Sequence, residues 1–217
     1  MRQILIAIDG PAGSGKSTVA RAVASRLRLD YLDTGAMYRA VAFAAITRDI
    51  DPADSEAVAR LAKEIDLQVD GAVRVDGVDA TVEIRGPEVT RTVSTVAANP
   101  AVRQEMVARQ RAWADAHGGG VVEGRDIGTV VFPDANLKIY LTAADSERAH
   151  RRSKELLELH YDQVAADMAR RDRVDSTRRA SPLAVADDAV VLDTTGVDVD
   201  EVIAKVLELA SRSGADA

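Results

Sequence analysis

The segment DGPAGSGKST, residues 9–18, directly follows the apolar run ILIAI of residues 4–8. It matches the phosphate-loop pattern G-x-x-x-x-G-K-[S/T] in the required setting of strand, glycine-rich turn and helix. Glycines let successive backbone N–H groups converge on one anion, and a helix beginning near Lys16 adds the positive end of its dipole. A solvated glycine-rich turn is the alternative, but the complete pattern favours a nucleoside triphosphate site.

Each residue of this loop is a predicted nucleotide contact. Lys16 is placed for the β and γ phosphates, and the Ser17 hydroxyl is placed to bind Mg²⁺. The predicted contacts are Gly10, Pro11, Ala12, Gly13, Ser14, Gly15, Lys16, Ser17 and Thr18.

Composition narrows the class of protein. The 217 residues suit one compact α/β domain with insertions. The net charge of −7 argues against binding to duplex nucleic acid, which normally needs a basic surface. The chain has no cysteine, which excludes disulfides, thiolate metal sites and cysteine nucleophiles. No apolar run approaches membrane-spanning length, so we expect a cytoplasmic monomer that binds neither nucleic acid nor membrane.

Hydrophobic periodicity predicts alternating strands and helices. Parallel-sheet strands are expected at residues 4–8, 31–32, 121–122, 136–141 and 189–192. Helices are expected at residues 16–28, from 34 onward, and at 54–62, 87–97, 100–116 and 199–209. The three glycines at 118–120 are interpreted as a flexible linker.

Residues 64–86 depart from this alternation. Apolar residues there recur at every second position, including the pair Val82 and Ile84, and the dipeptides Asp70-Gly71 and Asp76-Gly77 interrupt them. Such dipeptides are strong hairpin signals. We therefore predict a small antiparallel insertion that supports a second binding lobe.

Polar residues follow two of the predicted strands, at the edge where open α/β sheets bind ligands. Asp33 ends one strand and is placed to steer Mg²⁺ through a water molecule, while Thr34 and Arg39 share one side of the next helix. A helix cap at Thr34 and a surface role for Arg39 remain an equal alternative. At the end of the other strand, the EGRD segment at 123–126 is predicted to face a ligand.

Arginines gather in residues 145–179 of this otherwise acidic chain. Arg148 and Arg152 are four positions apart and share one helix face. An ordinary solvated helix pair laced by ion pairs is the alternative. With a polyphosphate bound nearby, we expect a mobile lid that carries arginines.

This inventory favours phosphoryl transfer to a small acceptor. The N-K-x-D element of a guanine-reading switch is absent from the sequence. A phosphate monoester has a second pKa of about 6 and is already a nucleophile near pH 7, so no general base is needed. Arginines, Lys16 and Mg²⁺ then stabilise the transferring phosphoryl group.

The sequence resembles the cytidylate kinase family of nucleoside monophosphate kinases over nearly its whole length. The similarity lies in IDGPAGSGKST, LDTGAMYR, the short β insertion, EGRDIGTVVFPDA, AHRR and RDRVDSTRRASPL. It implies ATP as co-substrate, Mg²⁺, and CMP and dCMP as acceptors. The alternatives kept open are another small acceptor such as UMP or a shikimate-like alcohol, and a nucleotide-gated binding module.

The resemblance also assigns acceptor-binding roles. It implies phosphate contacts from Thr34, Tyr38, Arg39, Arg125, Arg171 and Arg178, cytosine contacts from Ser94, Arg103 and Asp126, and a ribose contact from Asp175. An Asp accepts from the cytosine N4 amino group, which gives Asp126 a physical basis. A plain helical ion-pair ladder is the alternative for Arg171, Asp175 and Arg178. Glu123, an aspartate in some members, is given a supporting role.

The predicted architecture is a phosphate-loop NTPase-type parallel sheet core, with the antiparallel insertion in an acceptor-binding lobe and a helical lid. The core comprises residues 1–33, 118–147 and 180–217, the lobe 34–117 and the lid 148–179. The predicted catalytic residues are Lys16, Arg125, Arg148, Arg152 and Arg171.

Overall fold

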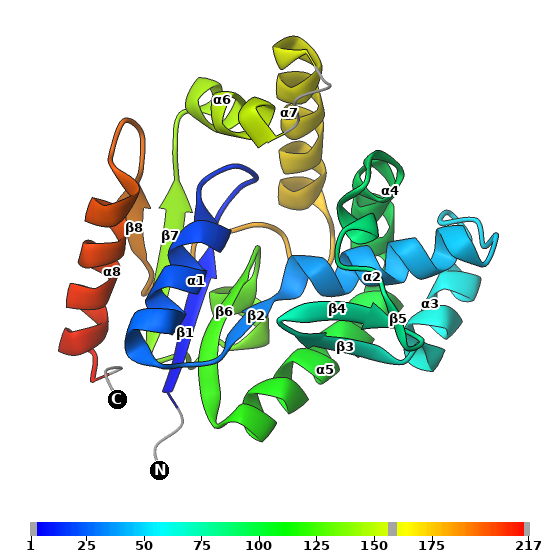
Figure 1. The fold of residues 1–217 in the computed structure, drawn as a ribbon, viewed down its shortest axis with the longest axis horizontal. Coiled ribbons are helices and arrows are strands. Elements are labelled where there is room, and N and C mark those ends of the chain that lie inside the picture. Colours follow the sequence, from blue (N-terminus) through cyan, green and yellow to red (C-terminus); the bar gives the residue numbers. More distant parts are fainter. Residues whose placement is uncertain (1–3, 156–159, 215–217) are drawn as a thin grey trace. The chain divides into compact units, whose positions relative to one another are not determined.

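The computed structural model describes residues 4–155 and 160–214, and the chain divides into two compact units (Figure 1). Unit 1 comprises Met1–Tyr31 and Ala114–Ala217, and unit 2 comprises Leu32–Trp113. Residues 156–159 of the predicted lid lie outside the described residues. The boundaries of core, lobe and lid given above stay a prediction.

Unit 1 is built on the main sheet, whose strand order is β2-β6-β1-β7-β8. The strands are β1 (Ile4–Asp9), β2 (Tyr31–Asp33, which begins in unit 1), β6 (Gly119–Gly124), β7 (Leu137–Thr142) and β8 (Val190–Asp193). β1 pairs in parallel with β6 and β7, and β7 pairs in parallel with β8. The central position of β1 explains its continuous apolar run, because both faces of a parallel strand are covered. The predicted parallel α/β core is confirmed.

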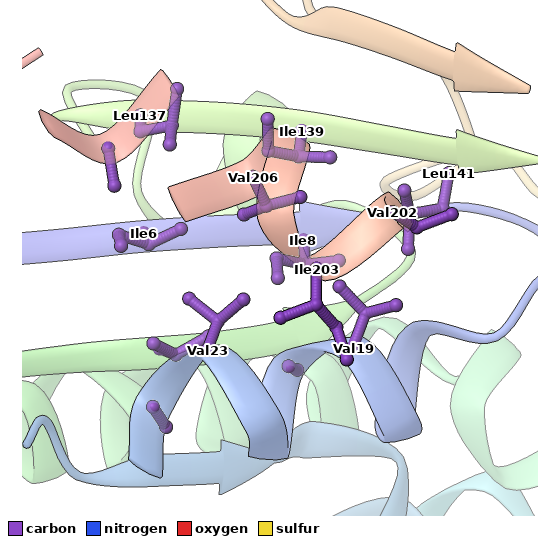
Figure 2. Packing of buried hydrophobic residues seen from close by; sticks show 14 residues of the cluster. Ile6, Ile8, Val19, Val23, Leu137, Ile139, Leu141, Val202, Ile203 and Val206 are labelled. Carbon is purple, nitrogen blue, oxygen red and sulfur yellow. The ribbon is translucent and has the colours of Figure 1, made fainter. Parts of the chain in front are cut away.

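Aliphatic side chains fill the core of unit 1 between this sheet and two helices, α1 (Lys16–Leu27) and α8 (Val199–Arg212). Figure 2 shows side chains of both helices gathered against those of β1 and β7. The labelled members of the cluster are Ile6, Ile8, Val19, Val23, Leu137, Ile139, Leu141, Val202, Ile203 and Val206. Burial of each such aliphatic side chain stabilises the folded state by about 1.5–3 kcal/mol, so this core does not depend on aromatic side chains. This packing fixes the end of β1 from which the phosphate loop leaves.

The predicted linker at residues 118–120 is wrong, because Gly119 and Gly120 belong to strand β6. Both glycines are buried and pair with Ile4 and Leu5 of β1. A Cβ on Gly119 would lie 2.0 Å from the carbonyl oxygen of Ile4, and its φ is +114°. The glycines therefore permit close strand approach, which composition alone does not distinguish from flexibility.

The remaining helices of unit 1 follow the strands β6 and β7. Asp126 is followed by a single π-helical turn, η2 (Ile127–Val131), which the sequence did not predict. After β7 come α6 (Asp145–Glu155) and α7 (Tyr161–Thr177), which pack against each other at a steep angle (Figure 1). Ala149, Val164 and Met168 form a small buried cluster between these two helices.

Unit 2 contains helices and a three-stranded sheet of order β3-β4-β5. Its elements are α2 (Thr34–Thr47), α3 (Ser55–Glu64), β3 (Leu67–Asp70), β4 (Ala72–Val75), β5 (Val78–Asp79), η1 (Glu83–Arg85), α4 (Pro87–Ala98) and α5 (Pro100–His117, which ends in unit 1). The antiparallel insertion is confirmed. The alternation of Val82 and Ile84 is a 3₁₀ turn rather than a strand, with Ile84 buried and Val82 exposed.

Among the described residues, no helix combines the length and apolar character needed to cross a membrane.

Candidate active site

The phosphate loop leaves β1 at Gly10 and enters α1 at Lys16. A Cβ on Gly10 would lie 2.0 Å from the carbonyl oxygen of Leu141, so only glycine fits beside β7. Gly15 caps α1 in the left-handed conformation, with φ 88°. The N-terminus of α1 therefore opens onto the loop, as expected for an anion-binding turn.

Lys16 lies inside this loop with 7% of its surface exposed. Its ammonium donates to the carbonyl oxygen of Pro11 at 2.7 Å and lies 3.4 Å from the Ser14 hydroxyl. Burial, and secondly the charge of Arg125, lower the pKa of Lys16 to about 7. A polyphosphate in the loop would supply the negative charge that this buried ammonium requires.

Ser17 and Glu123 form the oxygen-rich side of the loop. The Ser17 hydroxyl donates to Glu123 Oε2 at 2.9 Å, and Glu123 is 3% exposed at the end of β6. A hydroxyl and a carboxylate are ligands that Mg²⁺ accepts together with nucleotide phosphates and water. Within the described residues, no cluster of three or more metal-ligating His, Asp or Glu side chains occurs. The pair fits a metal held mainly by the nucleotide, and the supporting role predicted for Glu123 stays a prediction.

Asp33, the other predicted metal residue, belongs to unit 2. Its Oδ1 accepts from the Ala36 N–H at 3.0 Å and caps α2, and its Oδ2 lies 3.1 Å from the Arg85 guanidinium. The helix cap that the sequence left open at Thr34 is therefore Asp33.

Asp9, at the end of β1, is a site residue that the sequence analysis missed. Its carboxylate accepts from the N–H groups of Ile127 at 2.9 Å and Gly128 at 2.8 Å. These are the first two residues of η2, so Asp9 fixes the backbone that follows Asp126. A charged residue ending an apolar strand at the ligand edge was the available signal.

The buried carboxyl of Asp9 predicts a pH dependence of stability. Burial raises the pKa of Asp9 from 3.8 to about 6, although the N–H groups of Gly128 and Ile127 oppose this. Between these values the unfolded chain has released the proton that the folded chain retains, so stability falls as pH rises. The side chain of Asp9→Asn cannot ionise, so this variant lacks the pH dependence that Asp9 causes. The difference in unfolding free energy, wild type minus variant, should therefore fall by on the order of 2 kcal/mol from pH 4.5 to 7.

Urea unfolding of both proteins across this pH range measures the difference. Any constant cost of the amide cancels, because only the pH dependence is compared. A difference that stays constant with pH would contradict a raised pKa at Asp9.

Arg125 connects the phosphate loop to α7. Its Nη1 donates to the carbonyl oxygen of Gly10 at 3.0 Å, and its Nε donates to Asp175 Oδ2 at 2.9 Å. Arg171, one helical turn before Asp175, lies 4.0 Å from the same carboxylate. Burial, and then the charge of Arg125, lower the pKa of Arg171 to about 10, and Arg152 contributes in the same direction. The guanidinium groups of these arginines are therefore close enough to repel one another.

Arg178 completes this cluster. Its Nη2 lies 3.4 Å from Asp126 Oδ1, and its Nη1 lies 3.8 Å from Asp175 Oδ1. Burial would raise the pKa of Asp175, but the charges of Arg125, Arg171 and Arg178 outweigh it and hold that pKa below its ordinary value. Unit 1 thus brings together all five residues that the resemblance assigned to it for acceptor binding, with three guanidinium groups beside two carboxylates.

Arg148 ties α6 to the phosphate loop. It donates to the carbonyl oxygen of Ala12 at 2.8 Å, to Asp172 Oδ2 at 2.5 Å and to Asp145 Oδ1 at 2.7 Å. Asp172, on α7, also accepts from the Ala12 N–H at 3.1 Å. The sequence indicated Asp172 only as a possible ion-pair partner within the helix pair, and its contact with the loop depends on the fold. The contacts of Arg148 hold α6 and α7 against the phosphate loop, and its catalytic role stays a prediction.

Unit 2 holds the other predicted acceptor residues on α2, α4 and α5. Tyr38 and Arg103 are adjacent, with the Arg103 guanidinium carbon 5.3 Å from the Tyr38 ring centre. Arg39 donates to Thr90 Oγ1 at 2.9 Å. Thr34 is buried at the start of α2, and Ser94 is half-buried on α4. Tyr38 and Arg103 therefore form one cluster within unit 2. The role of Ser94 stays a prediction.

The parallel sheet and this loop define the class of P-loop nucleotide-binding proteins. A gluconokinase from Sinorhizobium meliloti 1021 aligns with a TM-score of 0.53 and 12% identity, covering 97% of this chain and 93% of that chain. An unliganded sugar kinase from Janibacter sp. HTCC2649 aligns with a TM-score of 0.50 and 18% identity, covering 99% of both chains. At such low identity these similarities show the fold alone.

The chain belongs to the cytidylate kinase family, whose model matches residues 6–212. It is 50% identical to the cytidylate kinase of Desulfitobacterium hafniense (strain Y51), over 96% of this chain and 93% of that protein. It is 48% identical to that of Mycobacterium leprae (strain Br4923), over 99% of both. It also matches longer proteins, and spans 45% of the bifunctional pantoate ligase/cytidylate kinase of Synechococcus sp. (strain CC9902), at 48% identity over 96% of this chain.

Proposed function

We propose that the protein transfers the γ-phosphoryl group of ATP to CMP or dCMP, giving ADP and CDP or dCDP. A phosphate oxygen of the acceptor forms a bond to the γ phosphorus, and the bond from that phosphorus to the oxygen bridging it to the β phosphorus breaks. The contact that carries the proposal is that of Arg125, which bridges Gly10 of the phosphate loop and Asp175 of the arginine cluster. One side chain thus adjoins both predicted anion sites of unit 1, as the activity of the family requires.

The arginine cluster is the proposed means of binding the acceptor phosphate. Arg125, Arg171 and Arg178 carry three positive charges beside Asp126 and Asp175, and the lowered pKa of Arg171 reflects burial first and then the charge of Arg125. A phosphate would relieve this repulsion. Because the acceptor oxygen is already ionised near pH 7, these side chains need only hold and orient two anions.

We propose that Lys16 moves from the Pro11 carbonyl to the β and γ phosphates, where it offsets developing charge. Arg152, which lies close enough to affect the pKa of Arg171, is the proposed second cation there. Arg148 and Asp172 hold the helix pair α6 and α7 against the loop. Exclusion of water by this helix pair would favour the acceptor over hydrolysis.

Ser17 and Glu123 are the proposed protein groups for Mg²⁺, with Asp33 kept as an outer contact through water. A metal held by these two residues would supply positive charge to offset the negative charge of the nucleotide phosphates. In unit 2, the proposed acceptor contacts are Thr34, Tyr38, Arg39, Ser94 and Arg103. A cytoplasmic location and a monomeric state also stay predictions.

An acceptor panel tests this function. ADP release is coupled to a spectrophotometric signal, with ATP and Mg²⁺ present and with CMP, dCMP, UMP, shikimate or no acceptor added. We expect ADP formation with CMP and dCMP at least about 10²-fold above that without acceptor, since water lacks the bound orientation of the nucleotide. ADP formation independent of acceptor would instead support a nucleotide-gated module, and a preference for UMP or shikimate would support another acceptor.

A further inference from the structure

Two hydroxyl groups of unit 1 hold the single carboxylate of Glu123. The Ser17 hydroxyl donates to Oε2 at 2.9 Å, and the Tyr31 hydroxyl donates to the other oxygen, Oε1. The two donors come from α1 and from the start of β2, whereas Glu123 lies on β6. We propose that Tyr31 is a positioning residue that orients the Glu123 carboxylate, and through it the metal of the nucleotide, at Ser17. This inference rests on the metal role proposed above for Ser17 and Glu123.

The length of the glutamate side chain makes a second anchor useful. Glu has three rotatable side-chain bonds, and a hydrogen bond to one oxygen leaves the other free to rotate away from its target. Mg²⁺ demands near-ideal octahedral geometry at about 2.0–2.1 Å, so a carboxylate that swings weakens binding. Donation from Tyr31 to Oε1 fixes the plane of the carboxylate and leaves Oε2 directed at Ser17.

Tyr31 is itself held in place by its ring. The guanidinium carbon of Arg21, on α1, lies 5.3 Å from the ring centre, and the ring packs against the aliphatic cluster of unit 1. These contacts involve the ring rather than the hydroxyl. Tyr31→Phe therefore preserves these ring contacts and removes the hydroxyl that donates to Glu123.

A purely structural role is the competing explanation. A buried carboxylate needs hydrogen bonds, and Tyr31 could serve only to satisfy Glu123. In that case Tyr31→Phe would lower the thermal unfolding temperature and leave metal affinity unchanged. Positioning predicts that metal affinity itself falls, so the two roles differ in a quantity that is measured without turnover.

The experiment measures Mn²⁺ binding to the protein–ADP complex from the free Mn²⁺ electron paramagnetic resonance signal. ADP affinity without metal and thermal unfolding are recorded in parallel. Outer-contact substitutions typically weaken metal binding about 10–100-fold, and we expect about tenfold for Tyr31→Phe. Tyr161→Phe, at an exposed tyrosine of α7, is the matched control and should bind Mn²⁺ as wild type does.

Two changes at Glu123 separate this inference from the metal assignment. Glu123→Gln should weaken Mn²⁺ binding more than Tyr31→Phe, and adding Tyr31→Phe to it should cause no further loss, because Tyr31 acts through the carboxylate. Glu123→Asp, one methylene shorter, should lose affinity as Tyr31→Phe does, since it cannot keep both contacts.

The outcomes are distinguishable. The inference about Tyr31 would be overturned if Tyr31→Phe bound Mn²⁺ with wild-type affinity, or if the losses of the two single variants added in the double variant. In either case, weakened Mn²⁺ binding by Glu123→Gln would still support the metal assignment. Wild-type affinity in both Glu123→Gln and Tyr31→Phe would overturn the assignment and the inference together.

Discussion

Lys16→Met is expected to lower kcat by about 10³-fold while the folded structure persists. Loss of one hydrogen-bond donor to a transition-state oxyanion typically lowers kcat by about 10²–10³-fold, and in the proposed site Lys16 also supplies a full positive charge. Methionine keeps the length of the aliphatic stem and removes the ammonium. Burial lowers the pKa of Lys16 to about 7, so the folded chain already disfavours the charged form. The thermal unfolding temperature without nucleotide should therefore not fall at neutral pH, and the stabilisation by ATP should shrink.

Coupled ADP-release kinetics and thermal unfolding with and without ATP measure the two effects. Lys205→Met is the matched control, because Lys205 lies on α8 and pairs with the exposed Glu208. It should leave kcat unchanged. Near-normal turnover in Lys16→Met would exclude Lys16 from the phosphate site, and a lost fold would show that its bond to Pro11 is structural.

The sequence predicted those parts of the site that depend on local pattern. The strand, the glycine turn and the helix around Lys16 are contiguous, so their geometry follows from backbone preferences alone. The hairpins after Asp70 and Asp76 were predicted for the same reason. The prediction of a strand at Val82 and Ile84 was wrong, because alternation of apolar residues over so short a stretch does not distinguish a strand from a 3₁₀ turn.

Contacts between distant residues were beyond local pattern. Asp172 reaches the Ala12 N–H across 160 positions, and Asp9 reaches Gly128 across 119. The place of Asp9 at the end of an apolar strand indicated a site residue, but for both aspartates only the fold identifies the backbone groups that they contact. The same holds for Tyr31. In the sequence it is one residue of a short predicted strand, and only the folded structure places Glu123 of β6 beside its hydroxyl. The family resemblance supplied the proposed acceptor residues, but it did not indicate the contacts made by Asp9, Tyr31 or Asp172.

Asp126→Asn is expected to lower the ratio of kcat/KM for CMP to that for UMP by about 10²-fold, because a hydrogen bond to a charged group is worth roughly 1.5–3 kcal/mol. In the proposed site, the carboxylate accepts from the N4 amino group of cytosine. Uracil would present a carbonyl oxygen to the buried carboxylate and leave its charge unpaired. The asparagine amide can donate to that carbonyl, so the variant should gain activity with UMP as it loses activity with CMP.

Steady-state kinetics with CMP and UMP at saturating ATP measure the ratio, and KM for ATP should stay unchanged. The variant should fold, because Arg178 keeps its contacts with Asp175 and the Ser181 carbonyl. Asp134→Asn, at an exposed aspartate of unit 1, should leave the ratio as in wild type. An unchanged ratio in Asp126→Asn would remove Asp126 from base recognition without affecting the kinase proposal. CMP and UMP share their phosphate and ribose, so a shift in the ratio must arise at the base edge.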